Sequence, residues 1–179
     1  MDTLQAPTDE SWLVLRAQAG SRDHLEQLME ITQRFLTPRL TPLFDERADA
    51  EDVLQDVLFT LCRRLGTLND VRLFRPWAHR IAVRAAWKAI NRRRREFQRT
   101  ETIDDTFPAN LPEASGHDLA TLLNRVSPAS RIVLMLHYLD GYTLEATAAE
   151  LGVASGTVKS RLAYGLKQLR ELGLPNATG

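Results

Sequence analysis

Residues 142–171 decide the fold of this chain, and they read YTLEATAAELGVASGTVKSRLAYGLKQLRE. Thr143 is a favourable N-cap residue for a short helix. Gly152 follows that helix, at a point where a left-handed backbone costs a glycine little, and Val153 is an apolar residue that can pack between two crossing helices. The two expected helices cover residues 144–151 and 155–172. This order of cap, helix, turn and helix predicts a helix-turn-helix.

The second of these helices is expected to be the DNA-recognition helix. Burial of Val158, Leu162, Leu166 and Leu169 would leave the polar residues of its N-terminal end facing outward. Hydroxyl groups and free backbone N–H groups at a helix N-terminus can hold phosphates, and Lys and Arg side chains can reach base edges in the major groove. The predicted DNA-binding residues are Ser155, Gly156, Thr157, Lys159, Ser160 and Arg161.

This segment resembles the C-terminal DNA-binding domain of the extracytoplasmic-function (ECF) sigma factors of bacterial RNA polymerase, above all in the string GTVKSRL. The preceding string SPASRIVLMLHYLDGYT is also similar to the family, with Ser127 as N-cap, Pro128 at the first helical position and Gly141 after the helix. The resemblance implies that this domain reads the promoter element roughly 35 base pairs upstream of the start site.

The string DAEDVLQDVLFTL, residues 49–61, predicts an amphipathic helix whose buried stripe contains Val53, Val57, Leu58 and Leu61. It resembles the polymerase-binding helix of the same family, which docks on a coiled coil of the core enzyme. The resemblance implies that the polar side of this helix binds core RNA polymerase. The residues implied are Asp49, Glu51, Asp52, Gln55 and Asp56.

The string FRPWAHRIAVRAAWKAINRRRRE, residues 74–96, resembles the family segment that recognises and opens the promoter roughly 10 base pairs upstream of the start. Basic residues recur here every four positions and predict a basic ridge along one side of a helix, made of Arg80, Arg84, Lys88 and Arg92. We expect the neighbouring side to pack against the domain through Phe74, Trp77, Ile81, Ala85 and Ala89. With the preceding loop, the residues predicted to bind this promoter element are Asn69, Asp70, Arg75, Arg80, Arg84 and Lys88.

Apolar residues recur at helical spacing on both sides of an acidic, Pro-containing stretch, and no alternating strand pattern appears. The predicted fold class is therefore all-α, with two small helical domains joined by a flexible acidic linker. The predicted domains are residues 1–98 and 118–179, with residues 99–117 as the linker. The other expected helices cover residues 11–19, 21–36 (ended by Pro38), 48–65, 74–95, 118–126 and 128–139.

Composition excludes several other classes. The formal net charge is zero, but basic and acidic residues are sorted into separate blocks, which is typical of a protein whose surfaces face different partners. No apolar run is long enough for membrane insertion, and a secretory signal is not recognisable, so a cytoplasmic location is expected. The single cysteine, Cys62, is expected in the core. Scattered histidines predict no metal or cofactor, and no catalytic constellation appears.

The leading hypothesis is a sigma factor that binds core RNA polymerase and promoter DNA and is not an enzyme. The family resemblance also implies an anti-sigma factor as a partner. A sigma-like adaptor or decoy that sequesters a regulator is one alternative, although such a protein has no need of Lys159 and Arg161. A stand-alone helix-turn-helix regulator is another, but it leaves the first 98 residues unexplained.

Overall fold

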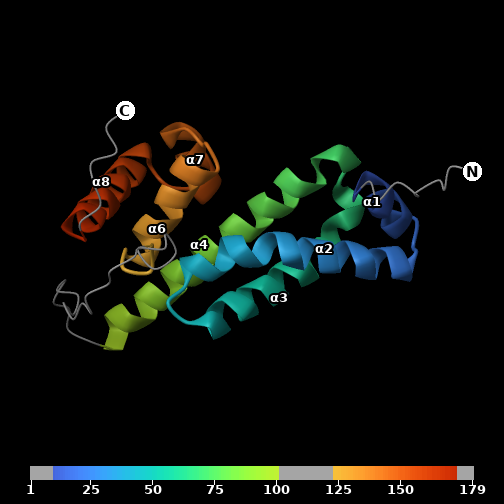
Figure 1. The fold of residues 1–179 in the computed structure, drawn as a ribbon, viewed down its shortest axis with the longest axis horizontal. Helices are drawn as coiled ribbons and strands as arrows, with labels where there is room; N and C mark the ends of the chain where they lie inside the picture. Colours follow the sequence, from blue (N-terminus) through green and yellow to red (C-terminus); the bar gives the residue numbers. More distant parts are fainter. Residues whose placement is uncertain (1–9, 101–122, 173–179) are drawn as a thin grey trace, which may run out of the picture.

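The computed structural model describes residues 10–100 and 123–172, without the side chains of 97–100, and every regular element in these ranges is helical. The predicted all-α class is confirmed (Figure 1). The N-terminal part contains α1 (Glu10–Gln18), α2 (Arg22–Leu40), the 3₁₀ turn η1 (Thr41–Leu43), α3 (Arg47–Arg64), the 3₁₀ turns η2 (Leu65–Thr67) and η3 (Val71–Leu73), and α4 (Phe74–Thr100). The C-terminal part contains α6 (Pro128–Leu134), the π-helical turn η4 (Met135–Leu139), α7 (Leu144–Leu151) and α8 (Ser155–Glu171).

The N-terminal part is a bundle in which α2, α3 and α4 pack along one another, with α1 against one end of α2 (Figure 1). Its core is apolar and contains the fully buried Leu28, Leu36, Val57, Leu61 and Phe74. Burial of such side chains stabilises a bundle by about 1.5–3 kcal/mol each. The bundle therefore holds α3 and α4 firmly, and these are the helices that carry the predicted polymerase and promoter residues.

The prediction that Pro38 ends the second helix is wrong, because α2 continues through Pro38 to Leu40. Side chains around the proline bond to backbone carbonyls of the same helix. The Thr37 hydroxyl donates to Gln33 O at 2.8 Å, and Arg39 Nη1 donates to Phe35 O at 2.9 Å. These added hydrogen bonds support the last turns of a helix that lacks one backbone N–H donor.

The buried face of α4 is also shifted from the predicted one. Trp77, Ile81, Ala85 and Ala89 are only half-buried, whereas the fully buried stripe contains Phe74, Ala78, Ala82, Ala86 and Ile90. Three small alanines at i, i+4 spacing allow α4 to approach α2 and α3 closely.

The predicted burial of Cys62 is likewise wrong, because the cysteine is exposed on α3, one position beyond the buried Leu61.

The C-terminal part forms the predicted helix-turn-helix. Thr143 caps α7 by accepting a hydrogen bond from the Ala146 N–H at 3.0 Å. Gly152 ends the helix with φ 65°, in the left-handed region that favours glycine, and the Val153 N–H donates to Ala148 O at 3.0 Å. α8 then begins at Ser155 and packs against both α6 and α7.

α4 reaches Thr100, so the first two residues of the predicted acidic linker are helical. The remaining linker residues and the first part of the helix expected over 118–126 lie outside the described residues.

Among the helices that the structure describes, none has both the length and the apolar character that a membrane crossing requires.

Candidate nucleic-acid and polymerase interfaces

The N-terminal end of α8 exposes three of the six predicted recognition residues fully and the other three in part. Gly156, Lys159 and Ser160 are exposed, while Ser155, Thr157 and Arg161 are half-buried. Ala154 is the N-cap residue and provides no side-chain acceptor, so no capping side chain covers the N–H groups of the first turn. An uncapped helix N-terminus beside exposed Lys and Ser side chains is suited to binding a phosphate. The structure therefore brings the six residues together on one helix end.

The basic ridge (Arg80, Arg84, Lys88 and Arg92) runs along the exposed side of α4 as predicted. Its two halves differ in their surroundings. Lys88 and Arg92 make no ion pair with any other described residue. Arg80 and Arg84 instead face the C-terminal part, where both contact Glu150 of α7.

The set predicted for the same promoter element also includes Asn69, Asp70 and Arg75, and two of these three have partners within the N-terminal part. Asp70 caps η3 by accepting from the Arg72 N–H at 3.1 Å, and it pairs with the Arg72 guanidinium at 2.8 Å. The hydrogen bond from the Arg72 side chain lowers the pKa of Asp70, which therefore keeps its negative charge. Arg75 pairs with Glu10 of α1 at 2.9 Å and lies over the Phe35 ring. Asn69 is exposed.

The predicted polymerase residues separate into two groups on α3. Asp49 is an ion-pair partner of Arg93 of α4, and Glu51 pairs with Arg47 at 2.6 Å. The other three residues are exposed, and their side chains form no ion pair or hydrogen bond within the part of the chain that the structure describes; they are Asp52, Gln55 and Asp56, hereafter the acidic face of α3. Within the predicted set, the acidic face is the part available to a basic partner.

Sequence reasoning missed Phe59, which continues the acidic face by one turn. Its side chain is 63% exposed, and the Arg63 guanidinium lies 5.6 Å from its ring centroid. Exposed aromatic side chains surrounded by polar groups often carry much of the binding energy of an interface. The helical spacing could have revealed it, because Phe59 does not belong to the buried stripe of Val53, Val57 and Leu61 and must therefore face outward.

The two parts of the chain meet at α4, which packs against both α6 and α7 (Figure 1). The carboxylate of Glu150 lies between two arginines of the basic ridge. Its Oε2 is 3.1 Å from Arg80 Nε, and its Oε1 is 2.9 Å from Arg84 Nε. Only 5% of the Glu150 side chain is exposed. Burial raises the pKa of the adjacent Tyr142, and the negative charge of Glu150 adds to that effect.

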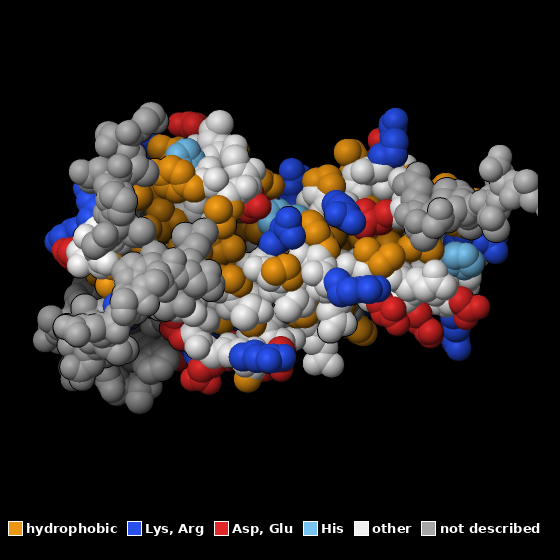
Figure 2. Space-filling view, viewed as in Figure 1, with side chains coloured by type: hydrophobic (Ala, Val, Ile, Leu, Met, Phe, Trp, Pro, Cys, Tyr) orange, Lys and Arg blue, Asp and Glu red, His pale blue; other side chains and the backbone are white. Residues whose placement is uncertain are grey.

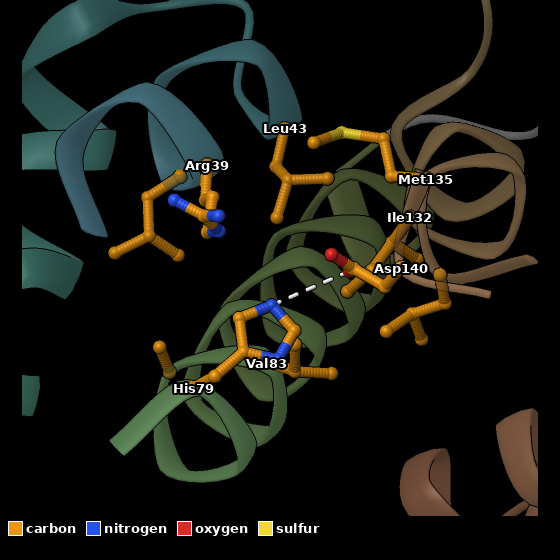
Figure 3. Close-up of a pocket in the computed structure, with 10 residues that line it drawn as sticks. Arg39, Leu43, His79, Val83, Ile132, Met135 and Asp140 are labelled. Carbon is orange, nitrogen blue, oxygen red and sulfur yellow. Dashed lines mark ion pairs between the residues drawn. The ribbon is translucent and has the colours of Figure 1, made fainter. Parts of the chain in front are cut away.

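Two further contacts between a basic and an acidic side chain join the same parts. His79 Nε2 of α4 lies 3.3 Å from Asp140 Oδ2, beside an apolar pocket lined by Leu43 of η1 and by Ile132 and Met135 of the C-terminal part (Figure 3). The other pair joins Arg131 to Asp45 at 2.8 Å.

Arg131 is the most buried charged residue among those described, with 1% of its side chain exposed. Its guanidinium donates to Pro42 O at 2.9 Å across the interface and to Val126 O and Asn124 O within its own part. Burial lowers the pKa of Arg131, while hydrogen bonding and charge attraction from Asp45 oppose that shift. A guanidinium nevertheless stays protonated in proteins, so the interface contains a permanent positive charge.

The surface also shows apolar side chains. On the face drawn in Figure 2, hydrophobic side chains gather over the C-terminal helices, while the N-terminal helices show separated Lys and Arg side chains. The large exposed hydrophobic residues of the C-terminal part are Tyr138, Leu139 and Tyr164.

Two family models match the chain. "Sigma-70 region 2" matches residues 21–96, which contain α2, α3 and most of α4, and "Sigma-70, region 4" matches residues 117–169, which contain the helix-turn-helix. The two models therefore cover the two helical parts separately. Between them lie residues 97–116, most of the acidic stretch that precedes α6.

Solved structures support the same fold. The sigma factor RpoE of Bartonella quintana, in complex with the anti-sigma factor NepR, matches with a TM-score of 0.55 and 24% identity over 82% of this chain and 94% of that chain. CnrH in complex with the cytosolic domain of CnrY matches with a TM-score of 0.54 and 22% identity over 91% and 96% of the two chains.

Curated relatives are more similar in sequence. The ECF RNA polymerase sigma factor SigM of Mycobacterium tuberculosis is 32% identical over 86% of this chain and 79% of its own length. The RNA polymerase sigma-E factor of Streptomyces coelicolor is 29% identical over 82% of this chain and 84% of its own length. Matches of this extent to both helical parts show that the chain belongs to the ECF family of bacterial RNA polymerase sigma factors.

Proposed function

We propose that the chain binds core RNA polymerase and directs it to specific promoters through three separate surfaces. The acidic face of α3 and Phe59 bind polymerase, the basic ridge of α4 binds the promoter element nearer the start site, and the N-terminal end of α8 binds the upstream element. The functional domains are residues 1–98 and 118–179. The observation that carries the proposal is the helix-turn-helix geometry, in which Gly152 joins α7 to an uncapped recognition helix with exposed Lys159 and Ser160.

No catalytic role is proposed, because binding and positioning account for the sites described. Polymerase and promoter DNA as partners favour a cytoplasmic location. An anti-sigma factor is a further proposed partner. Two proteins of the same fold have been solved in complexes with the anti-sigma factor NepR and with the cytosolic domain of CnrY, and the exposed Tyr138, Leu139 and Tyr164 offer apolar surface for such a contact.

The promoter assignment is tested by overproducing the chain in its own bacterium and mapping the transcript start sites that appear. We expect the upstream sequences to align into two shared elements. A footprint of the holoenzyme on such a promoter should then weaken over the upstream element in Lys159→Ala, by about 1–3 kcal/mol of binding free energy. Induced transcripts without shared upstream elements would contradict the assignment.

The polymerase assignment is tested by measuring the affinity of the chain for purified core enzyme. Asp52→Arg reverses a charge on the acidic face, and Phe59→Ser removes the exposed ring. Each should weaken binding, with Phe59→Ser losing roughly 30-fold if the ring contributes as an interface hot spot. Glu26→Arg is the matched control, because Glu26 is an exposed acid on α2 outside the acidic face. Equal affinities of all four proteins would remove this surface from the interface.

A further inference from the structure

The carboxylate of Glu150 lies where the basic ridge would meet DNA. α7 has the sequence LEATAAEL, and Glu150 is its second acid. The first acid, Glu145, is exposed, whereas the Glu150 side chain is 5% exposed and contacts Arg80 and Arg84. An acid at a buried position needs a specific partner, and here that partner is half of the basic ridge.

The chemistry of this contact is that of a DNA backbone contact. Arg80 and Arg84 are one helical turn apart, so their guanidinium groups flank a single anionic group. Two oxygen atoms of one carboxylate take the positions that two phosphate oxygens could take, since arginine binds carboxylate and phosphate with the same geometry. While Glu150 is in place, a phosphate cannot take the same position between the two guanidinium groups.

The rest of the interface keeps α7 over the ridge. The His79–Asp140 pair and the apolar pocket beside it hold α4 against η4 (Figure 3). Arg131 bonds to Pro42 of η1 and to Asp45, which follows η1. The recognition end of α8 is left open by the same arrangement, because Lys159 and Ser160 remain exposed. The interface therefore engages two arginines of one proposed DNA surface and leaves the other surface without such a contact.

This arrangement cannot be the one that contacts a whole promoter. Two elements roughly 25 base pairs apart are separated by about 85 Å along the duplex, since a turn of about 10 base pairs spans about 34–36 Å. Helix α4 touches α7, which joins directly to the recognition helix, so the two DNA surfaces lie much closer together than that. The two parts must separate before both elements can be bound.

The Glu150 contact is suited to being replaced. Oε1 lies 2.9 Å from Arg84 Nε but lacks the alignment of a hydrogen bond, and the two arginine side chains are more than half exposed. A carboxylate that is buried without full hydrogen bonding loses much of its charge attraction to desolvation. The contact is therefore specific in place, and a competing anion can still reach the exposed arginines and replace the carboxylate.

We propose that Glu150 is an internal substitute for promoter DNA, which occupies Arg80 and Arg84 in the free sigma factor and keeps the basic ridge inactive until the two parts separate. This inference rests on the proposed role of the basic ridge in binding DNA. It assigns to α7 a second role beside that of a helix-turn-helix scaffold.

The test uses the full chain without polymerase and a fluorescein-labelled oligothymidylate as a single-stranded probe at low ionic strength. Glu150→Gln should bind the probe at least about fivefold more tightly than the natural protein, the lower end of ordinary intramolecular coupling. Its radius of gyration, measured by small-angle X-ray scattering, should increase. Glu145→Gln is the matched control, since it removes the same charge from an exposed position of the same helix and should change neither quantity.

A second variant weakens the contact between the two parts without changing a ridge residue or Glu150. Asp140→Asn removes the partner of His79 and should also expand the chain and tighten probe binding. Adding Lys88→Gln to Glu150→Gln should remove much of the gain, because Lys88 belongs to the ridge but does not contact Glu150. Circular dichroism establishes that each variant keeps its helical content.

The outcomes distinguish a failure of the proposed DNA-binding role of the ridge from a failure of the Glu150 inference alone. If Glu150→Gln expands the chain but binds no more tightly, the ridge is not a DNA site, and both the proposed function of the ridge and this inference fail. If the natural protein already binds the probe through Lys88 and Glu150→Gln does not improve it, the inference alone fails. An equal gain in Glu145→Gln would also overturn it, because loss of any negative charge would then suffice.

Discussion

At the scale of single residues, charge pairing decides which of the polar side chains are available to a partner. Asp49 and Glu51 have ion-pair partners, while the side chains of Asp52 and Asp56 have none among the residues that the structure describes. The sequence pattern places five polar residues on one helix, but it does not indicate which of them form intramolecular ion pairs. The partner of Asp49 is Arg93, more than 40 residues away, and such a pairing depends on how α3 and α4 are packed.

Cys62 provides a prediction that depends on pH. The residue is exposed, yet protein atoms on one side of the thiol desolvate it and raise its pKa above the ordinary value. The thiolate is the reactive form, so a raised pKa leaves less of it at any pH below that pKa. At pH 8, iodoacetamide should alkylate Cys62 in the folded chain more slowly than in the urea-unfolded chain, as measured by mass spectrometry.

The difference between the two rates should narrow as the pH rises above the pKa of the folded thiol. The unfolded chain is the internal control, because it contains the same cysteine without the folded surroundings. A folded-state rate equal to or faster than the unfolded rate at pH 8 would show that the thiol is not desolvated.

At the scale of helices, most elements follow from the sequence, whereas the face that each helix buries is less certain. Caps and turns act locally, so the roles of Thr143 and Gly152 could be predicted and are confirmed. The pattern predicts a buried stripe of α4 that continues from Phe74 through Trp77 and Ile81, but Ala78, Ala82 and Ala86 are the residues buried there. Hydrophobic spacing is the same for both stripes, and only the close approach of α2 and α3 selects the smaller one.

The two glycines of α8 give a paired prediction at this scale. A Cβ atom at Gly156 meets no other atom within 4 Å, whereas one at Gly165 lies 2.9 Å from Leu134 Cδ1 and 3.1 Å from Ser130 Cβ. Gly156→Ala should stabilise the chain by up to about 1 kcal/mol, because alanine favours helix. Gly165→Ala should destabilise the chain, because an overpacking cost of about 1–3 kcal/mol exceeds the gain in helix propensity.

Urea unfolding followed by circular dichroism measures both changes in the free energy of unfolding. Each variant is the control of the other, since the substitution and the helix are the same. If Gly165→Ala is as stable as Gly156→Ala, then α6 and α8 do not cross as closely as the structure shows.

At the scale of the whole molecule, the arrangement of the two parts was beyond sequence reasoning. Sequence patterns indicated two helical parts and the residues proposed to bind DNA, but they contain no signal that Glu150 meets Arg80 across 70 positions. Arg131 directly precedes the apolar run IVLML, which is a weak signal of a buried polar contact, although its partners Pro42 and Asp45 could not be named from it. Such contacts depend on how the N-terminal and C-terminal parts pack against each other.

Arg131 provides the prediction at this scale. Arg131→Met keeps much of the side-chain volume but leaves buried carbonyl groups without a donor, including Val126 O. We expect the free energy of unfolding to fall by about 2–3 kcal/mol, because an unsatisfied buried acceptor costs about 1–3 kcal/mol and the exposed Asp45 can be rehydrated. Urea unfolding measures the change. Arg34→Met, at an exposed site on α2, is the control and should change stability by less than about 0.5 kcal/mol.

A change below about 0.5 kcal/mol in Arg131→Met would show that the guanidinium is not held as the structure describes.

Arg131 and Glu150 also differ in how they respond to sequence change elsewhere. Three acceptors of Arg131 are main-chain oxygens, which every amino acid supplies, so residues 42, 124 and 126 can be replaced without deleting an acceptor. Glu150 depends on two particular side chains, and one substitution at Arg80 or Arg84 alters its contact. Relatives could therefore retain the anchor between the two parts while gaining or losing the DNA substitute independently, and the strength of inhibition could vary among proteins that share one architecture.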